Sequence, residues 1–202
     1  MIVLPSSPFP STQYLAVLVH AGIQLVIDEG EHYVKQSLRN RFEILTANGP
    51  SFITIPVEGQ KGVKIPVKNI RIAPDPWQKH ALRSIRSAYG RSPYFIHYED
   101  ELEELLLSNY KRLSDFNMAT LEWITSLMGI APKWSTSSEY FESEVIESDY
   151  RRKVSMLDAG LKNTPYSQVF EDRFSFQANL SSLDLLMNVG PESLQVLNEM
   201  AG

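Results

Sequence analysis

The chain has 202 residues, 19 basic and 24 acidic side chains for a net charge of -5, 43% hydrophobic residues and no cysteine. This composition is typical of a globular protein, and a chain of this length buries about 70% of its unfolded surface without help from disulfides or metals. The missing cysteines exclude a disulfide framework, a thiolate nucleophile and a cysteine-ligated metal, and the negative charge argues against nucleic acid as a partner.

The first 28 residues predict a parallel strand–helix–strand unit. Its strand, helix and second strand are expected at residues 2–4, 12–19 and 23–27. A proline-rich segment, residues 5–10, follows the first strand, and Asp28 ends the second. Ligands bind beyond the carboxyl ends of parallel strands, so we expect the functional rim to include residues 5–10 and the loop 28–41.

The amino-terminal residues lack the basic and long apolar regions of a signal peptide. The most apolar stretch, residues 14–27, is shorter than the roughly 20 residues that span a bilayer. We therefore expect a soluble, cytoplasmic protein with no membrane insertion.

A β-hairpin is predicted next, at residues 42–46 and 51–57 around Asn48-Gly49. Asn-Gly is a strong hairpin signal because both residues tolerate positive φ. A further short strand is expected at residues 69–73.

Helices dominate the second half. Asp75-Pro76 is expected to open a helix that ends before Gly90, with Asp75 as its N-cap. Further helices are expected at residues 100–112, 115–128 and from about 179 onward. The first of these has acidic residues at its start and basic ones at its end, which suits the helix dipole. Residues 133–138 read as a polar loop, and residues 139–174 have no clear pattern.

These elements predict an α/β fold: a small mixed sheet with an N-terminal βαβ unit and a β-hairpin, followed by a mainly helical C-terminal half. We expect one domain over residues 1–202, with its α/β part at 1–74 and its mainly helical part at 75–202.

Charge is distributed unevenly along the chain. Residues 35–91 hold eleven basic and three acidic side chains, whereas residues 92–202 hold eight basic and eighteen acidic ones. Either the basic block converges on an anionic ligand, or it neutralises the acidic part across a packed fold.

The segment 32–41 is the first candidate site, because its three bases lie within seven residues. Lys35, Arg39 and Arg41 are candidate ligands for a phosphate or another anion, with Asn40 to orient it. No glycine-rich phosphate-binding motif is present. The alternative is that these basic side chains form ion pairs with acidic side chains of the C-terminal half.

Candidates for proton transfer are Asp28, His32 and His80. The neighbouring Glu29 and Glu31 are expected to be solvated loop charges or to form ion pairs with Arg39 or Arg41, and the alternative is acid/base catalysis or binding of sugar hydroxyls. The alternative for His80 is a hydrogen-bonded residue at the edge of its helix's apolar stripe. Four histidines without metal-binding spacing predict no protein-held metal, and the sequence leaves any cofactor unknown.

An ordered series of short motifs resembles the WbqC-like family of bacteria. The matching segments are residues 33–41, 47–49, 55–57, 77–80, 87–95, 115–117 and 179–192. Many family members open with Gln-Pro-x-Tyr-x-Pro-Trp-x-Gly-Tyr. This chain keeps Pro10 and Tyr14 but has Pro8, Ser11 and Gln13 in place of the first Tyr, the Trp and the Gly, which suggests a divergent branch.

Family members tend to accompany genes for O-antigen and other surface polysaccharides, and a glycyl-transferase role has been suggested for some. The resemblance implies transfer of a small acyl or aminoacyl group onto a nucleotide-activated sugar. Lys35, Arg39 and Arg41 would then bind the pyrophosphate, and replacing Arg39 or Arg41 by alanine is expected to abolish binding while the fold stays intact.

The alternative is a non-catalytic partner or scaffold in polysaccharide assembly, so whether the chain is an enzyme stays open here, as does its oligomeric state. Convergence of Lys35, Arg39, Arg41 and His80 on one cleft would favour the enzyme. Their spread over a convex face would favour the scaffold.

Overall fold

A parallel four-stranded sheet forms the centre of the fold. The computed structural model describes residues 1–22, 24–59, 63–131, 134–142, 144, 146–152 and 160–200. The order across the sheet is β5-β2-β1-β6, and every neighbouring pair is parallel. The strands are β1 (Ile2–Pro5), β2 (Leu25–Asp28), β5 (Trp134–Ser137) and β6 (Ser148–Asp149).

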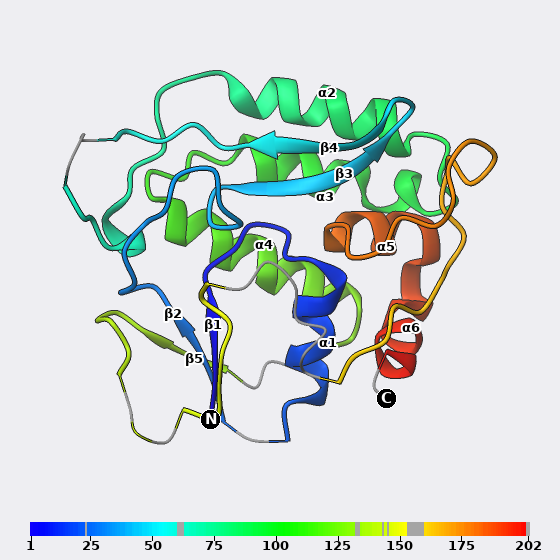
Figure 1. The fold of residues 1–202 in the computed structure, drawn as a ribbon. Helices are drawn as coiled ribbons and strands as arrows, with labels where there is room; N and C mark the ends of the chain where they lie inside the picture. Colours follow the sequence, from blue (N-terminus) through cyan, green and yellow to red (C-terminus); the bar gives the residue numbers. More distant parts are fainter. Residues whose placement is uncertain are drawn as a thin grey trace.

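The predicted strand–helix–strand unit is confirmed. Helix α1 (Thr12–His20) connects β1 to β2, and the Ser11 side chain caps it by accepting a hydrogen bond from the Tyr14 backbone N–H. The first three residues of β2 form an apolar run that is buried, as is typical of a parallel sheet, and Asp28 at its end is buried as well. β1 runs from the N-terminus toward the hairpin (Figure 1).

The two outer strands were not expected from the sequence. Trp134–Ser137, predicted as a polar loop, pairs with β2 in the register that places Asp28 beside Ser137. β6 pairs with β1 through Ile2 and Val3. Both strands are short and mostly polar, and neither shows an alternation of apolar residues. Hydrogen bonding to the central strands therefore determines their structure.

The predicted hairpin is confirmed as β3 (Arg41–Thr46) and β4 (Gly49–Thr54), paired antiparallel. Gly49 carries the positive φ of the turn, at 101°. The strand expected at residues 69–73 is wrong: this segment follows a 3₁₀ turn, η1 (Val67–Asn69), and makes only single bridges, from Arg71 and Ile72.

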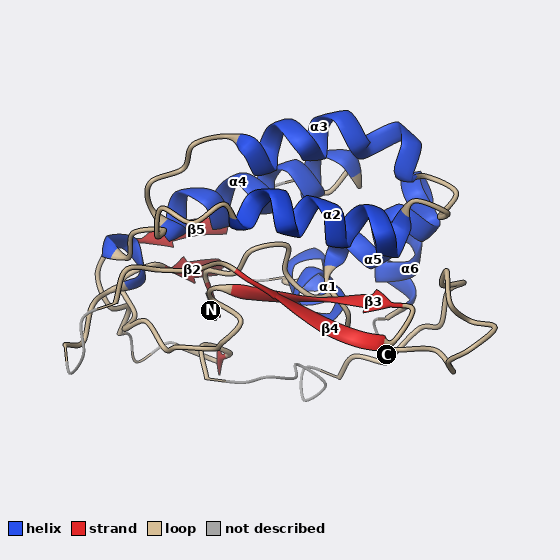
Figure 2. Ribbon diagram, turned by 90° about the horizontal axis from the view of Figure 1, so that it is seen from above, coloured by secondary structure: helices blue, strands red, loops and turns tan. Residues whose placement is uncertain are grey.

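The helices of the second half pack on one side of the strands (Figure 2). They are α2 (Trp77–Tyr89), α3 (Phe95–Leu107), α4 (Leu113–Leu127), α5 (Ser182–Val189), the 3₁₀ turn η3 (Gly190–Glu192) and α6 (Ser193–Glu199). Within the described residues, no helix is long and apolar enough to cross a membrane. The fold is α/β, as predicted.

The predicted starts of α2, α3 and α4 are wrong, and α4 begins at Leu113 rather than at residue 115. Helix α2 has no side-chain cap, and Pro76, not Asp75, precedes its first residue. Helix α3 begins at Phe95, so the acidic residues 100–104 lie in its middle and the bases at 111–112 lie beyond its end. Burial of Phe95, Leu102 and Leu106 determines where this helix lies, because packing outweighs the small dipole contribution.

An aromatic cluster joins the hairpin to the helices. Phe9 is fully buried, and its ring centroid lies 4.8 Å from Phe42 of β3 and 6.0 Å from Phe116 of α4. Its backbone has a φ of 37°, and its N–H donates to Thr120 Oγ1 at 3.1 Å. The proline-rich segment after β1 is therefore anchored in the core at its centre.

Candidate functional site

The loops at the carboxyl edge of the parallel sheet are tied together by buried side chains. Ser7 Oγ donates to the Leu38 carbonyl at 2.7 Å. Asn117 Nδ2 of α4 donates to Ser6 Oγ at 3.1 Å and to the Arg39 carbonyl at 3.0 Å. The segment after β1 and the loop after β2 consequently form one rim, at the edge where ligands bind in open α/β sheets.

A pocket of about 290 Å³ opens at this rim. It is lined by residues 34–39 and Arg41 of the loop after β2, which we call the anion-pocket loop, and by Pro5 at the end of β1, Phe52 of β4 and residues 151–152. Among the described residues, its lining includes five basic side chains and no acidic one: Lys35, Arg39, Arg41, Arg151 and Arg152. We call it the anion pocket.

Arg39 is buried and ion-paired. Its Nη2 contacts Glu31 Oε2 and donates to the Arg151 carbonyl. Burial raises the pKa of Glu31 to about 7, although the Arg39 guanidinium opposes this shift. The expected pairing of Glu31 is confirmed. An alanine at position 39 would leave the Glu31 carboxyl buried without its partner, so the fold is not expected to stay intact.

Arg151 is the second buried cation, and it neutralises Asp28. Its Nη1 lies 2.6 Å from Asp28 Oδ2, and its Nη2 lies 2.6 Å from Asp149 Oδ2. Hydrogen bonding from Arg151 lowers the pKa of Asp149. Asp28 also accepts backbone N–H bonds from Gly30 at 2.9 Å and Phe141 at 3.1 Å. Both of its oxygens are occupied, so we assign Asp28 to holding the rim together rather than to proton transfer.

The remaining cations of the anion pocket are Lys35, Arg41 and Arg152. Among the described residues, none of the three forms an ion pair with a carboxylate. Arg41 stacks on Phe52, with its Cζ 4.2 Å from the ring centroid. These three groups are therefore available to an anionic ligand, whereas Arg39 and Arg151 are neutralised behind them.

Asn40 supports the loop from outside the pocket. It is buried, its Nδ2 donates to the Ile55 carbonyl at 3.0 Å, and its own carbonyl accepts from the Ile55 N–H at 2.8 Å. These contacts attach the anion-pocket loop to the residue that follows β4. Asn40 thus positions its neighbours Arg39 and Arg41.

Neither His32 nor His80 is among the described residues that line the anion pocket. His32 is exposed, two residues before the pocket-lining segment, and its backbone bridges to Pro66. His80 is exposed on α2 and lines a different hollow, of about 310 Å³, with Trp77. Phe52 lines both hollows. The structure brings Lys35, Arg39 and Arg41 together and leaves His80 in the neighbouring hollow.

Arg151 and Arg152 were not predicted from the sequence as site residues. They lie where no periodic pattern predicts structure, more than 100 residues from the loop that they join. The available signal was an Arg-Arg pair in a stretch that is otherwise strongly acidic. Within the described part of the chain, no group of three or more histidine or acidic residues is arranged to hold a metal ion.

Comparisons with known proteins identify a family. A model described as the WbqC-like protein family matches residues 6–159, which is more than half of the chain. An uncharacterized protein of Mycobacterium tuberculosis (strain ATCC 25618 / H37Rv), Rv1507c, is 25% identical over 139 residues. That alignment covers 68% of this chain and 60% of the relative, so the chain spans less than two thirds of that protein's length. No solved structure matches. The segment that forms the anion-pocket loop lies inside the family match.

Proposed function

The chain belongs to the WbqC-like protein family, and from this premise we propose that it is a cytoplasmic transferase. It moves a small acyl or aminoacyl group, such as glycyl, onto a nucleotide-activated sugar in the synthesis of an O-antigen-type surface polysaccharide. The observation that supports this proposal is the anion pocket, where Lys35, Arg41 and Arg152 lack a carboxylate partner among the described residues.

The pyrophosphate of the nucleotide sugar binds to these three cations. The arginines offer forked N–H donors that suit phosphate oxygens, and Lys35 adds a mobile charge. Arg39 and Arg151 keep the pocket's wall in place through their own ion pairs. Because the wall is formed before the ligand arrives, little ordering cost opposes binding.

The nucleobase lies against the stacked pair of Arg41 and Phe52. The Phe52 side chain is 44% exposed, and Val34, also in the lining, is 54% exposed. Guanidinium and phenyl planes are both good stacking surfaces for a base. The pocket therefore combines charge for the phosphates with an apolar surface for the base.

The transfer itself is direct. A hydroxyl or amine of the sugar attacks the acyl carbonyl carbon, the bond to the donor's leaving group breaks with its electron pair, and the acceptor loses a proton. The chain has no cysteine, so no protein thioester forms. His32, exposed and next to the pocket-lining loop, is the proposed proton acceptor.

The binding step is tested by calorimetric titration of UDP-glucose and of inorganic pyrophosphate into the protein. Arg41→Gln is expected to weaken the affinity for UDP-glucose at least tenfold, and Lys35→Gln and Arg152→Gln several-fold, because each removes a charge-assisted contact. Lys79→Gln, an exposed cation on α2 outside the pocket, is the matched control. Unchanged titration heats for Arg41→Gln would refute the proposed site.

The transfer step is tested separately, by mass spectrometry of nucleotide sugars incubated with protein and a panel of aminoacyl and acyl donors. The proposal expects a product heavier by the transferred group and lost in Arg41→Gln. Binding without any such product across the panel would favour the non-catalytic partner in polysaccharide assembly.

A further inference from the structure

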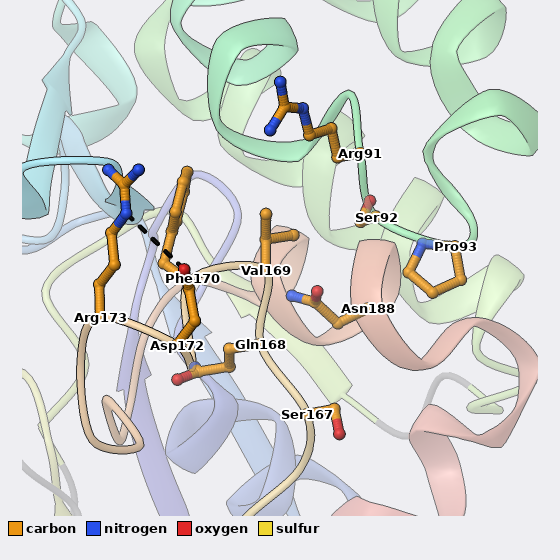
Figure 3. Close-up of a pocket in the computed structure, with 10 residues that line it drawn as sticks. All are labelled: Arg91, Ser92, Pro93, Ser167, Gln168, Val169, Phe170, Asp172, Arg173 and Asn188. Atoms are coloured by element: carbon orange, nitrogen blue, oxygen red, sulfur yellow. Dashed lines mark ion pairs between the residues drawn. The ribbon is translucent and has the colours of Figure 1, made fainter.

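A third hollow, of about 360 Å³, lies on the helical side of the molecule (Figure 3). The turn between α2 and α3, the loop 167–173 and α5 form its walls. It shares no lining residue with the anion pocket. Its volume falls within the range of about 300 to 1,000 Å³ that is common for small-molecule sites.

The walls of this hollow are held in place by buried hydrogen bonds. The Tyr94 N–H donates to the Met187 carbonyl at 3.1 Å, which attaches the α2–α3 turn to α5. Gln168 is buried, and its Nε2 donates to Asp184 Oδ2 at 2.8 Å, which attaches the loop to the same helix. The hollow is therefore preformed rather than a gap between mobile segments.

Two arginines from distant parts of the chain reach the hollow. Arg91 comes from the α2–α3 turn and Arg173 from the loop, and in Figure 3 the Arg173 head group lies beside Phe170 while Arg91 lies on the α2 side of the hollow. Both arginines line the same hollow, although most of its other lining residues come from the acidic stretch 92–202.

The positive charges of Arg91 and Arg173 are only weakly neutralised by nearby carboxylates. Among the described residues, Asp172 is the one acidic residue in the lining. Its carboxylate lies 3.9 Å from Arg173 Nε, and both side chains are more than half exposed. An exposed pair at that distance contributes little. Arg91 forms no ion pair with a carboxylate of the described residues. The hollow can therefore accept one further negative charge.

The rest of the lining suits a ligand with hydroxyl groups and a carbon ring. Asn188 Nδ2 donates to the Asp184 carbonyl at 2.8 Å, so the amide is oriented and its oxygen is open to a donor. In Figure 3 this amide points from α5 toward the loop, where Phe170 and Val169 supply an apolar surface. An oriented amide beside an aromatic ring is a common way to bind the polar edge and the flat face of a small ligand.

We propose that this hollow is a second binding site, for a monosaccharide that carries one carboxylate or phosphate. Arg91 and Arg173 bind the anionic group, and Asn188 accepts from a hydroxyl. The ring lies against Phe170.

The test is NMR titration of the ¹⁵N-labelled protein, which follows the side-chain amide of Asn188. The probes are glucuronate, glucose 6-phosphate and neutral glucose. Saturable shifts of that amide are expected with at least one of the two anionic sugars and not with glucose, because the arginines supply most of the affinity. Which anionic probe binds more tightly distinguishes the carboxylate from the phosphate source.

The variants Arg91→Gln and Arg173→Gln are each expected to weaken that binding at least tenfold, whereas Arg83→Gln, an exposed cation of α2 outside the hollow, retains it. All three are surface changes, so the amide spectrum itself verifies that each variant is folded. The site is overturned if neither anionic sugar shifts Asn188, if glucose binds equally well, or if both arginine variants bind as the wild type does.

Discussion

Asp28 at the sheet edge and Asp184 on α5 are both fully buried carboxylates, and the protein stabilises them in different ways. Asp28 contacts the guanidinium of Arg151 at 2.6 Å. Asp184 accepts hydrogen bonds from the Tyr166 hydroxyl and the Gln168 amide, each at 2.8 Å, and no described cation pairs with it. Burial accordingly raises the pKa of Asp184.

The difference separates a region organised by charge from one organised by neutral packing. At the sheet edge, the cations that neutralise buried acids also form the wall of the anion pocket. Around α5, tyrosine and glutamine side chains surround the acid, and the nearby arginines stay at the surface. Removing a cation should therefore lower the free energy of unfolding far more at the sheet edge than around α5.

The largest expected effect is that of Arg151→Met. It leaves Asp28 buried without its cation, and breaking a buried ion pair from one side costs about 3 to 5 kcal/mol. Urea unfolding at pH 7 measures this loss. The neighbour Arg152 is exposed, so Arg152→Met is the matched control, with an expected change of about 0.5 kcal/mol or less. Similar losses for the two variants would contradict the proposed division between structural and ligand-binding cations.

The next effect concerns close packing beside α5. Gly190 has a φ of 62°, and a Cβ there would lie 2.4 Å from the Tyr94 ring. Gly190→Ala is expected to cost about 2 to 4 kcal/mol, because backbone strain and overpacking add.

Gly129 is the control for this prediction, since its φ is 69° and a Cβ there meets nothing within 4 Å. Gly129→Ala is expected to cost only about 1 kcal/mol, from the backbone alone. Thermal or urea unfolding compares the two variants. Equal losses would show that Tyr94 moves aside and that α5 does not depend on this contact.

The smallest expected effect is a change in how the free energy of unfolding depends on pH. Because the folded-state pKa of Asp184 is raised, the folded protein holds a proton that the unfolded chain has already released. The stability that this group contributes is therefore lost as pH rises from its ordinary value, near 3.8, through the raised one. Asp184→Asn keeps an acceptor for Tyr166 and Gln168 and removes the titration.

Urea unfolding between pH 4 and pH 8 is the measurement, and the readout is the difference between the wild type and Asp184→Asn. The variant should gain stability relative to the wild type as pH rises. Using the difference cancels the contribution of Glu31, whose pKa is also raised. A constant difference across the pH range would mean that Asp184 stays ionised in the fold.

Local patterns predicted much of the fold. The buried β2 run and the hairpin turn at Gly49 were identified because each depends on a few neighbouring residues. β5 was missed because its residues are polar and pair only with a strand about 110 positions earlier. The start of α3 was missed because burial of Phe95 fixes it, and burial depends on residues distant in the chain.

The candidate site was predicted only in part, because its cations come from segments that are distant in the chain. The sequence identified Lys35, Arg39 and Arg41 as a basic segment in a chain of net charge -5. It could not distinguish Arg39, buried against Glu31, from Arg41, which is unpaired among the described residues.

By itself, the sequence determined the local elements and the composition of the basic loop, because propensity, capping and turn chemistry act over a few residues. The tertiary structure alone decided which cations are neutralised and which are open to a ligand. The fold brings Arg151, which lies 123 positions after Asp28 in the chain, into contact with both Asp28 and Asp149. Coulomb energy and desolvation depend on distance and burial in three dimensions, and neither quantity can be read from sequence order.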